Sequence, residues 1–442
     1  MRKGLDGDHV AMQNDRVEYL SPDAWRQWHT ELLQSTVNRA WDRIPFYRKA
    51  MEAAGVTKDH IGSLDDISML PFTSRDDLSR NYPYGLFSVP LRDIVRIHTL
   101  RSAQANPIAL GYTDSDLRHR RALSSRFLAA CGVTRDDIVQ ICLDPGMSNI
   151  WQDIREGAEA IGALVIPPDS ISTGARLRVL ADFKTTCLVT TPSYGLHLLS
   201  MLRQDGLPIA SLSLKNAVLV GETLTDATRR ELEDGFSVDT WSGYGIFEAL
   251  GAGMAYECEY RCGLHLAMDH FIPEIIDPET GRQLEPGESG ELVVTTVTAR
   301  ANPLIRFRTG DITSLTMEPC KCGRTTWRMM PVSGRCDDLV TLRGIRISPD
   351  HIANFIAERA GGRRLPCLMV LRRRDHLMTI ELKVAIGVEN FSGSLPELHR
   401  WVREVEQSFE ENIGVACRVR PVEAASIIEK VPDDTLIGVV EL

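Results

Sequence analysis

Long apolar segments are absent from this chain of 442 residues. No stretch approaches the ~18 uninterrupted apolar residues that a membrane-spanning helix requires. The first fifteen residues, MRKGLDGDHVAMQND, contain no apolar core of the length found in signal peptides. We therefore expect a cytoplasmic protein that has no membrane partner.

An excess of positive charge is also absent, because the formal net charge is -10. Binding to nucleic acid or to an anionic membrane surface would favour a basic patch, so we expect neither partner. The chain is 43% hydrophobic and 25% charged, which is typical of a globular protein with a large buried core. Its 10 cysteines are expected to be thiols or metal ligands, since a reducing compartment disfavours disulfides. Small-molecule chemistry is the best expectation.

Between residues 137 and 236, short apolar runs alternate with amphipathic helical ones. In order they read DIVQICLD, EGAEAIGA, LVIPPD, ARLRVLADFK, TCLVTTPS, YGLHLLSMLRQ, NAVLVGE and TDATRRELEDGF. This alternation predicts an α/β fold with a doubly wound parallel sheet. Ligands of such sheets gather at the carboxyl ends of the strands, where TTPSY, VGET and WSGYG fall.

The pattern of the sequence changes after residue 258, from alternating strands and helices to strand-like runs. Strand-like runs around Pro/Gly turns predict a β subdomain at about 258–335, within a large N-terminal domain of residues 1–335. Residues 336–442 then predict a small α+β domain.

Many segments, in order, resemble the phenylacetate-CoA ligases, a branch of the enzymes that activate carboxylic acids as acyl adenylates. The matching segments include RIPFYRKAMEAAGV, LPFTSRDDL, GYTDSDL, YGIFEALG, GLHLAMDHFIPEIIDPETG, PLIRFRTGD, CKCGRT and GRCDDLVTLRG. The resemblance implies that ATP and a carboxylate form an acyl adenylate and pyrophosphate. The small C-terminal domain then moves, and coenzyme A takes the acyl group. Members of the family commonly form homodimers.

The resemblance assigns nucleotide-binding roles to three residues near the domain border. Asp311 takes the position of an aspartate that accepts hydrogen bonds from the ribose hydroxyls, which suits a carboxylate. Arg335 matches an arginine near the ribose and the α-phosphate, with a role in catalysis. Asp337 falls at the hinge between the domains. The alternatives are a strand-end aspartate that caps a turn and a solvated surface arginine.

Further matches lie in YGIFE and VGET. Glu248 matches a glutamate that helps to bind Mg²⁺ during catalysis, and its alternative is a surface acid at a helix start. Tyr244 and Gly245 line the adenine and α-phosphate side, and Glu222 lies near adenine. Phe247 departs from the family, which has Thr or Ser there, so a hydroxyl near the α-phosphate is missing.

Trp151 and Tyr194 lie in segments that line the acyl pocket of the family, which implies an aromatic carboxylic acid as substrate. The segment CLDPGMSNIWQ diverges from the aromatic-rich family version, so the acid stays open. One candidate role is the tailoring of a secondary metabolite, such as a phenazine carboxylate in phenazine biosynthesis.

Three thiolates and one imidazole make a closed tetrahedral zinc set. Cys258, His265, Cys320 and Cys322 supply these donors, and the resemblance implies a structural zinc there. Cys262 is a spare ligand. The alternative is a set of buried thiols in a β subdomain, with the close Cys-x-Cys arising by chance.

Two departures affect the handling of pyrophosphate. The segment LRSAQANPI lies opposite a Ser/Thr/Gly-rich, lysine-containing phosphate loop and keeps only Pro107, with Arg101 and Ser102 as the remaining polar candidates. It lacks the glycines that let backbone amides approach phosphate.

The second departure is at the end of the chain. Asp434 and Thr435 stand where the family has a Gly-Lys, and Lys430 could substitute only if the tail is shifted. Two hypotheses follow. The protein is an atypical adenylate-forming enzyme that uses ATP or AMP with Mg²⁺, or a catalytically silent homologue that carries an aromatic acid or adenylate. The better retention of the AMP side favours the enzyme.

Overall fold

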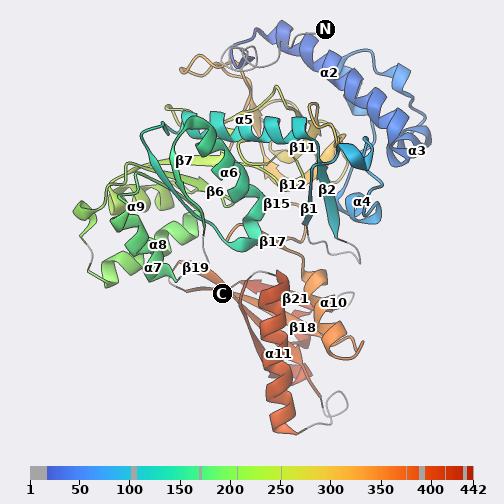
Figure 1. Ribbon diagram of the computed structural model, residues 1–442. Helices are drawn as coiled ribbons and strands as arrows, with labels where there is room; N and C mark the ends of the chain where they lie inside the picture. The colour runs from blue at the N-terminus through green and yellow to red at the C-terminus, as the bar shows by residue number, and fades with distance from the viewer. Residues whose placement is uncertain are drawn as a thin grey trace. The chain divides into compact units, whose positions relative to one another are not determined.

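The computed structural model describes residues 17–100, 107–168, 172–206, 208–249, 251–374, 376–387, 394–413, 415–431 and 436–441 (Figure 1). The chain divides into two compact units. The first contains residues 1–139, 152–165 and 241–336, and the second contains residues 140–151, 166–240 and 337–442. A border between the units falls between Cys336 and Asp337. The expected division into domains of 1–335 and 336–442 stays a prediction.

The first unit combines helices with mainly antiparallel strands. Its helices are α2 (Pro22–Arg43), α3 (Pro45–Ala53), α4 (Arg75–Arg80) and α5 (Asp114–Ala130). Its strands are β1 (Arg96–Leu100), β2 (Ile108–Tyr112), β8 (Ala255–Glu257), β9 (Leu264–Leu266), β10 (Phe271–Ile276), β11 (Gly290–Thr296), β12 (Phe307–Thr313), β13 (Leu315–Thr316), β14 (Arg328–Met329) and β15 (Gly334–Arg335). Helix α6 (Ser148–Ile161) and strands β3 (Ile138–Cys142), β4 (Leu164–Ile166) and β7 (Asp239–Tyr244) contain residues of both units.

Two antiparallel arrangements organise the first unit. One sheet has the order β10-β11-β12-β15, and β7, β8, β9, β14 and β13 follow one another in a second sheet. Every residue of β11 is buried, which fits its nearly continuous β-branched and apolar sequence, GELVVTT. The apolar core of this unit combines these strands with α2, for example Leu33 and Val37 with Leu292 and Val294.

The second unit contains the alternating part of the chain and the C-terminal part. Its helices are α7 (Thr173–Asp182), α8 (Pro192–Gln204), α9 (Asp226–Phe236), α10 (Pro349–Arg359) and α11 (Leu395–Ile413). Its strands are β5 (Cys187–Thr190), β6 (Asn216–Val220), β16 (Val340–Leu342), β17 (Ile345–Ile347), β18 (Cys367–Arg374), β19 (Leu377–Ala385), β20 (Cys417–Val422) and β21 (Ile437–Glu441).

The predicted alternation of strands and helices is confirmed. Strands follow the order β6-β5-β3-β4, and β5 and β6 run parallel, with Cys187 opposite Asn216. Apolar side chains at helical spacing on α7, α8 and α9 pack with β5 and β6 in one apolar cluster. The expected α/β class with a parallel sheet and further β structure is therefore correct.

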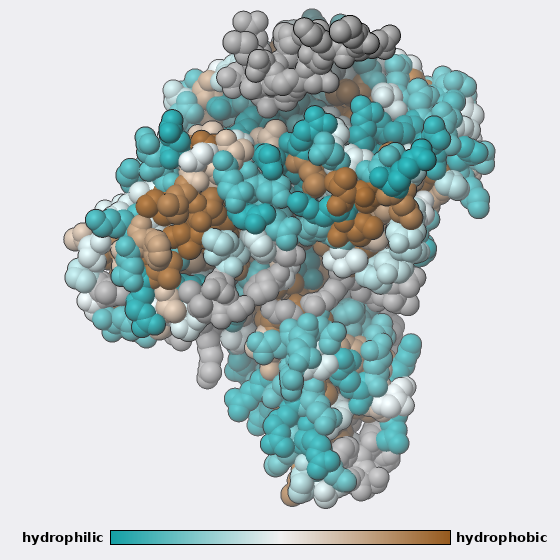
Figure 2. All heavy atoms as spheres, viewed as in Figure 1, coloured by the Kyte–Doolittle hydropathy of each residue, from teal (hydrophilic) through white to brown (hydrophobic). Residues whose placement is uncertain are grey.

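Residues 337–442 form an α+β arrangement, also as expected. The sheet has the order β20-β19-β18-β21, in which β18 and β19 are an antiparallel pair and the outer strands run parallel to their neighbours. Helix α11 packs on β20 and α10 packs on β21 (Figure 1). On the face drawn in Figure 2, this part of the chain presents mainly hydrophilic side chains. Among the described helices, none combines the length and the apolar character needed to cross a membrane.

Candidate active site

Three of the predicted nucleotide-binding residues meet in the first unit. Asp311 lies on β12 and is buried, and strand pairing places it opposite Arg335 of β15. The Arg335 guanidinium donates to one carboxylate oxygen of Asp311 and, over 2.9 Å, to the carbonyl of Thr309. The hydroxyl of Tyr244, at the end of β7, donates to the other carboxylate oxygen over 2.7 Å. Residues from three strands therefore build one polar cluster.

This cluster has the chemistry that recognition of a nucleoside monophosphate requires. A carboxylate can accept hydrogen bonds from two neighbouring hydroxyls at once, so an aspartate at position 311 is the residue type that suits ribose hydroxyls. The planar guanidinium of Arg335 suits phosphate oxygens, which it can contact through two parallel hydrogen bonds. Asp311 holds this cation in place through the β12–β15 pairing.

Gly245 follows Tyr244 and allows a close approach of the chain. A Cβ atom at this position would lie 2.6 Å from the carbonyl oxygen of Gly251, which is closer than carbon and oxygen can pack. The loop at residues 251–252 can therefore pass against the end of β7 only because residue 245 is a glycine.

Glu248 is a buried acid, and the alternative of a surface acid is wrong. Its side chain is 0% exposed, and its Oε1 lies 2.6 Å from Nη1 of Arg75, the first residue of α4. Arg75 lies in the segment LPFTSRDDL, which supported the family resemblance but had no assigned role. The sequence pattern gave no reason to pair these two residues, because they are far apart in the chain.

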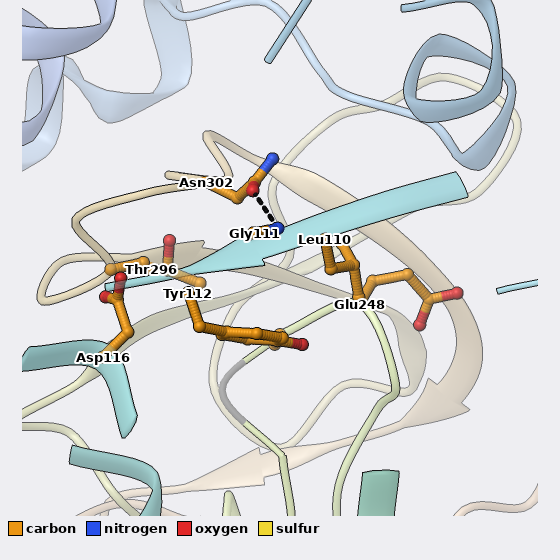
Figure 3. A pocket seen from close by; sticks show the side chains of 9 residues that line it. Leu110, Gly111, Tyr112, Asp116, Glu248, Thr296 and Asn302 are labelled. Carbon is orange, nitrogen blue, oxygen red and sulfur yellow. Dashed lines mark hydrogen bonds between the residues drawn. The ribbon is translucent and has the colours of Figure 1, made fainter. Parts of the chain in front are cut away.

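A pocket lies beside Glu248 (Figure 3). Its lining comes from β2, α5, β11 and the loops around Glu248 and Asn302, namely Leu110, Gly111, Tyr112, Asp116, Glu248, Ala249, Thr296, Ala299 and Asn302. The Asn302 side chain accepts a hydrogen bond from the Gly111 amide over 2.7 Å. Asp116 caps the start of α5 by accepting from the amide of Thr113, and it also accepts from the amides of Arg300 and Ala301. Backbone geometry around the pocket is thus fixed by side-chain acceptors.

A buried ion pair supports the loop that follows Glu248. Arg120 Nε and Nη2 lie 2.9 and 2.6 Å from the two carboxylate oxygens of Asp153, and both side chains are 2% exposed. Arg120 also donates to the carbonyl of Ala249 over 3.2 Å, and Asp153 accepts from the amide of Ala252. Burial raises the pKa of Asp153 to about 6, and the contact with Arg120 opposes this shift. The sequence contained no signal for this pair.

The remaining predicted ligand-binding residues lie in the second unit. Glu222 follows β6 and accepts two hydrogen bonds from Ser193 in the first turn of α8, from its amide over 2.9 Å and from its hydroxyl over 2.8 Å. These bonds satisfy a free helix N–H, so Glu222 has a structural role in α8. Burial raises the pKa of Glu222, and the bonds from Ser193 oppose this shift.

The two residues predicted for the acyl pocket are both partly buried. The Tyr194 hydroxyl lies 3.0 Å from Nη1 of Arg176 and 3.2 Å from the hydroxyl of Thr173, and the Arg176 guanidinium lies 5.3 Å from the centre of the Tyr194 ring. Trp151 lies on α6. The surroundings of Tyr194 are therefore more polar than a purely apolar aryl pocket.

Four predicted metal ligands come together in the first unit. The thiols of Cys258, Cys320 and Cys322 and the His265 ring offer donor atoms that all lie within 4.8 Å of one another. The Cys258 and Cys320 sulfurs are 3.6 Å apart, and the Cys322 sulfur is 3.3 Å from Nε2 of His265. Cys262 is exposed and is not in this group.

Tetrahedral zinc with its usual bond lengths would separate two sulfurs by about 3.8 Å and a sulfur and a nitrogen by about 3.5 Å, so the cluster fits the ion. Nδ1 of His265 lies 2.9 Å from the Thr326 hydroxyl, which leaves Nε2 directed at the thiols.

The remaining predicted positions are the hinge residue and the candidates for phosphate handling. Asp337 is exposed at the border of the units and accepts from the amide of Leu339. Pro107 and Lys430 are described, and Lys430 is exposed. The remaining candidates for phosphate handling lie outside the described residues, namely Arg101, Ser102, Asp434 and Thr435.

Comparison with known proteins gives the family. Residues 117–298 match the family described as AMP-binding enzyme. The phenylacetate-coenzyme A ligase of Thermus thermophilus is 35% identical over 422 residues, which cover 92% of this chain and 94% of that protein. The phenylacetate-coenzyme A ligase of Aromatoleum evansii is 34% identical over 414 residues, 93% of each chain.

Solved structures support the same fold. A crystal structure of 2-hydroxyisobutyryl-CoA ligase, in complex with 2-HIB-AMP and CoA, superposes with a TM-score of 0.87 and 24% identity. The match covers 97% of this chain and 91% of that chain. Together with the two ligases that are similar in sequence over almost their whole length, this shows that the chain belongs to the phenylacetate-CoA ligase-like branch of the adenylate-forming AMP-binding enzymes.

Proposed function

We propose that this protein activates an aromatic carboxylic acid as an acyl adenylate. The observation that carries the proposal is the cluster of Tyr244, Asp311 and Arg335, which brings a buried carboxylate and a fixed cation together. The names of the similar ligases support an arylacetic acid as the kind of substrate. A phenazine carboxylate is a second candidate acid, proposed from the sequence alone.

In the proposed reaction, an oxygen of the substrate carboxylate attacks the α-phosphorus of ATP. The bond from that phosphorus to the bridging oxygen breaks, and pyrophosphate leaves with the bonding electrons. Asp311 holds the ribose through its hydroxyls, and Arg335 stabilises the negative charge that develops on the α-phosphate. Coenzyme A is the proposed acceptor, and its thiolate would displace AMP from the acyl carbon.

Magnesium, when bound, would supply positive charge to the phosphates of ATP. The residue expected to hold it was Glu248, but this carboxylate is already paired with Arg75. The chain therefore fits a magnesium ligand poorly at this position, and we assign no step to Glu248 as a ligand.

We further propose that Cys258, His265, Cys320 and Cys322 hold a structural zinc ion. The donor set and its spacing support this proposal. The ion would join the turn after β8, strand β9 and the Cys320–Cys322 segment. It would stabilise the sheet that contains β7, β8 and β9, without contact with the substrate.

The test is carboxylate-dependent exchange of labelled pyrophosphate into ATP, measured across phenylacetate, substituted aryl acids and phenazine carboxylates. Asp311→Asn keeps the size of the side chain but loses the negative charge. We expect it to lower exchange by roughly 10- to 100-fold, which corresponds to one or two charge-assisted hydrogen bonds. Asp65→Asn is the control, because the Asp65 side chain is 69% exposed and forms a surface ion pair with Arg26.

The second candidate function is a silent homologue that binds an aromatic acid or an adenylate as a carrier. The altered phosphate-loop segment and the substituted C-terminal lysine favour it. Binding of AMP by calorimetry, without exchange for any acid, would support this function and contradict the enzyme. Exchange that Asp311→Asn lowers would support the enzyme.

A further inference from the structure

The ion pair between Arg75 and Glu248 lies where the family resemblance places a magnesium ligand. Glu248 is fully buried, and the Arg75 side chain is 22% exposed. Nη1 of Arg75 and Oε1 of Glu248 are 2.6 Å apart, which is the contact distance of a charge-assisted interaction. A protein cation therefore already neutralises this carboxylate.

A magnesium ion on the same carboxylate would compete with the guanidinium. Mg²⁺ binds oxygen at about 2.0–2.1 Å and demands nearly octahedral geometry. An ion on Oε1 would thus lie within about 5 Å of Nη1 of Arg75, and the two positive charges would repel each other in a site from which water is largely excluded. The ion could bind only if Arg75 moved away.

Other carboxylates near Glu248 do not compensate for this competition. Among the residues that line the pocket, Asp116 is the second acid. Its Oδ1 accepts from the Arg300 amide over 2.6 Å, and its Oδ2 accepts from the amide and hydroxyl of Thr113 and from the Ala301 amide. Asp116 is therefore committed to the backbone. In contrast, both oxygens of Glu248 lack a well-directed hydrogen bond from the described residues. The ion pair with Arg75 is therefore the contact that compensates the negative charge of Glu248.

We propose that Arg75 replaces the divalent cation at Glu248, so that this protein binds a nucleoside monophosphate without a metal ion on that carboxylate. The part of this inference that concerns nucleotide rests on the proposed function. The part that concerns the metal site does not, because it follows from the ion pair alone. The proposal concerns a metal ion on Glu248 and does not concern a divalent cation that is bound to the phosphates of ATP.

The metal part is tested with Mn²⁺, which can be followed by electron paramagnetic resonance in the absence of nucleotide. Wild-type protein and Glu248→Gln are expected to bind equal amounts of Mn²⁺, since Glu248 does not contribute a site. Arg75→Gln releases the carboxylate and is expected to bind more Mn²⁺ than the wild type at the same free concentration, a gain that the double variant Arg75→Gln/Glu248→Gln loses again. Arg75→Lys keeps the charge and should resemble the wild type.

Two results would overturn the inference. One is an extra Mn²⁺ site in the wild type that Glu248→Gln removes. The other is a folded Arg75→Gln protein that gains no Mn²⁺. If Arg75→Gln does not fold, the comparison of the wild type with Glu248→Gln still decides whether Glu248 binds Mn²⁺. Both of these proteins retain Arg75, so neither contains a Glu248 carboxylate without its partner.

The nucleotide part is tested by calorimetry with AMP, in buffer with millimolar Mg²⁺ and in magnesium-free buffer without a chelator, so that a zinc ion is retained. We expect the dissociation constant of the wild type to change by less than about twofold between the buffers. A change of tenfold or more that Glu248→Gln abolishes would refute the inference. Absence of AMP binding in both buffers would contradict the proposed function, while the Mn²⁺ result would still stand on its own.

Discussion

Replacement of Asp153 by alanine should be among the most destabilising single changes in the first unit. In the wild type, Asp153 accepts two hydrogen bonds from the Arg120 guanidinium, over 2.9 and 2.6 Å, and both side chains are 2% exposed. Alanine would leave a charged guanidinium in the core with neutral partners, the Ala249 carbonyl and the Tyr112 hydroxyl. Arginine cannot lose its proton to escape this cost.

The magnitude follows from the difference between buried and exposed pairs. Removal of one partner of a buried ion pair costs about 3–5 kcal/mol, because the other charge is left uncompensated. The pair of Arg26 and Asp65 has side chains that are 56% and 69% exposed, and such pairs contribute about 0–1 kcal/mol. Asp65→Ala is therefore a matched control in which the same chemical change occurs in water.

The assay is urea denaturation followed by tryptophan fluorescence, with the free energy taken from the first unfolding transition, since a chain of two units need not unfold in one step. The double variant Arg120→Met/Asp153→Leu removes both charges and keeps apolar volume, so it should be more stable than Asp153→Ala alone. The reasoning is refuted if Asp153→Ala lies within about 1 kcal/mol of Asp65→Ala. It is also refuted if the double variant is no more stable than the single one.

The remaining predictions concern acid stability and the metal. Burial lowers the pKa of His270 from 6.5 to about 4, although Asp269 acts in the opposite direction. Below about pH 6.5, His270 is therefore protonated in the unfolded chain but stays neutral in the folded chain until about pH 4. This difference should lower the free energy of unfolding by roughly 2 kcal/mol at pH 5 and roughly 3 kcal/mol at pH 4. His270→Gln should flatten this loss in unfolding measured between pH 7 and pH 4, and an unchanged slope would contradict the assignment. For the metal, protein purified without chelators should contain about one equivalent of zinc by mass spectrometry, and Cys322→Ala should contain far less. Less than about half an equivalent in the wild type would count against the site.

Sequence alone determined the fold class and much of the local chemistry. Apolar runs of strand length alternate with helical ones from residue 137 onwards, and burial makes such periodicity visible in one dimension. The four donor side chains that the structure brings together were also predicted, because a Cys-x-Cys pair and a Cys and His seven residues apart are short-range patterns. Asp311 and Arg335 were found through segments in which several neighbouring residues match the family.

Only the tertiary structure decided how charged residues pair. Arg75 meets Glu248, and Arg120 meets Asp153, through contacts between separate elements, and no spacing in the sequence encodes such a distance. The contact between Glu222 and α8 also depends on the tertiary structure, since Glu222 follows β6 and its carboxylate accepts from Ser193 in the first turn of α8. Local sequence patterns reflect burial and backbone geometry, whereas the environment of a charge depends on all the elements packed around it. The sequence therefore identified the acids of this site, and only the fold showed which residues they pair with.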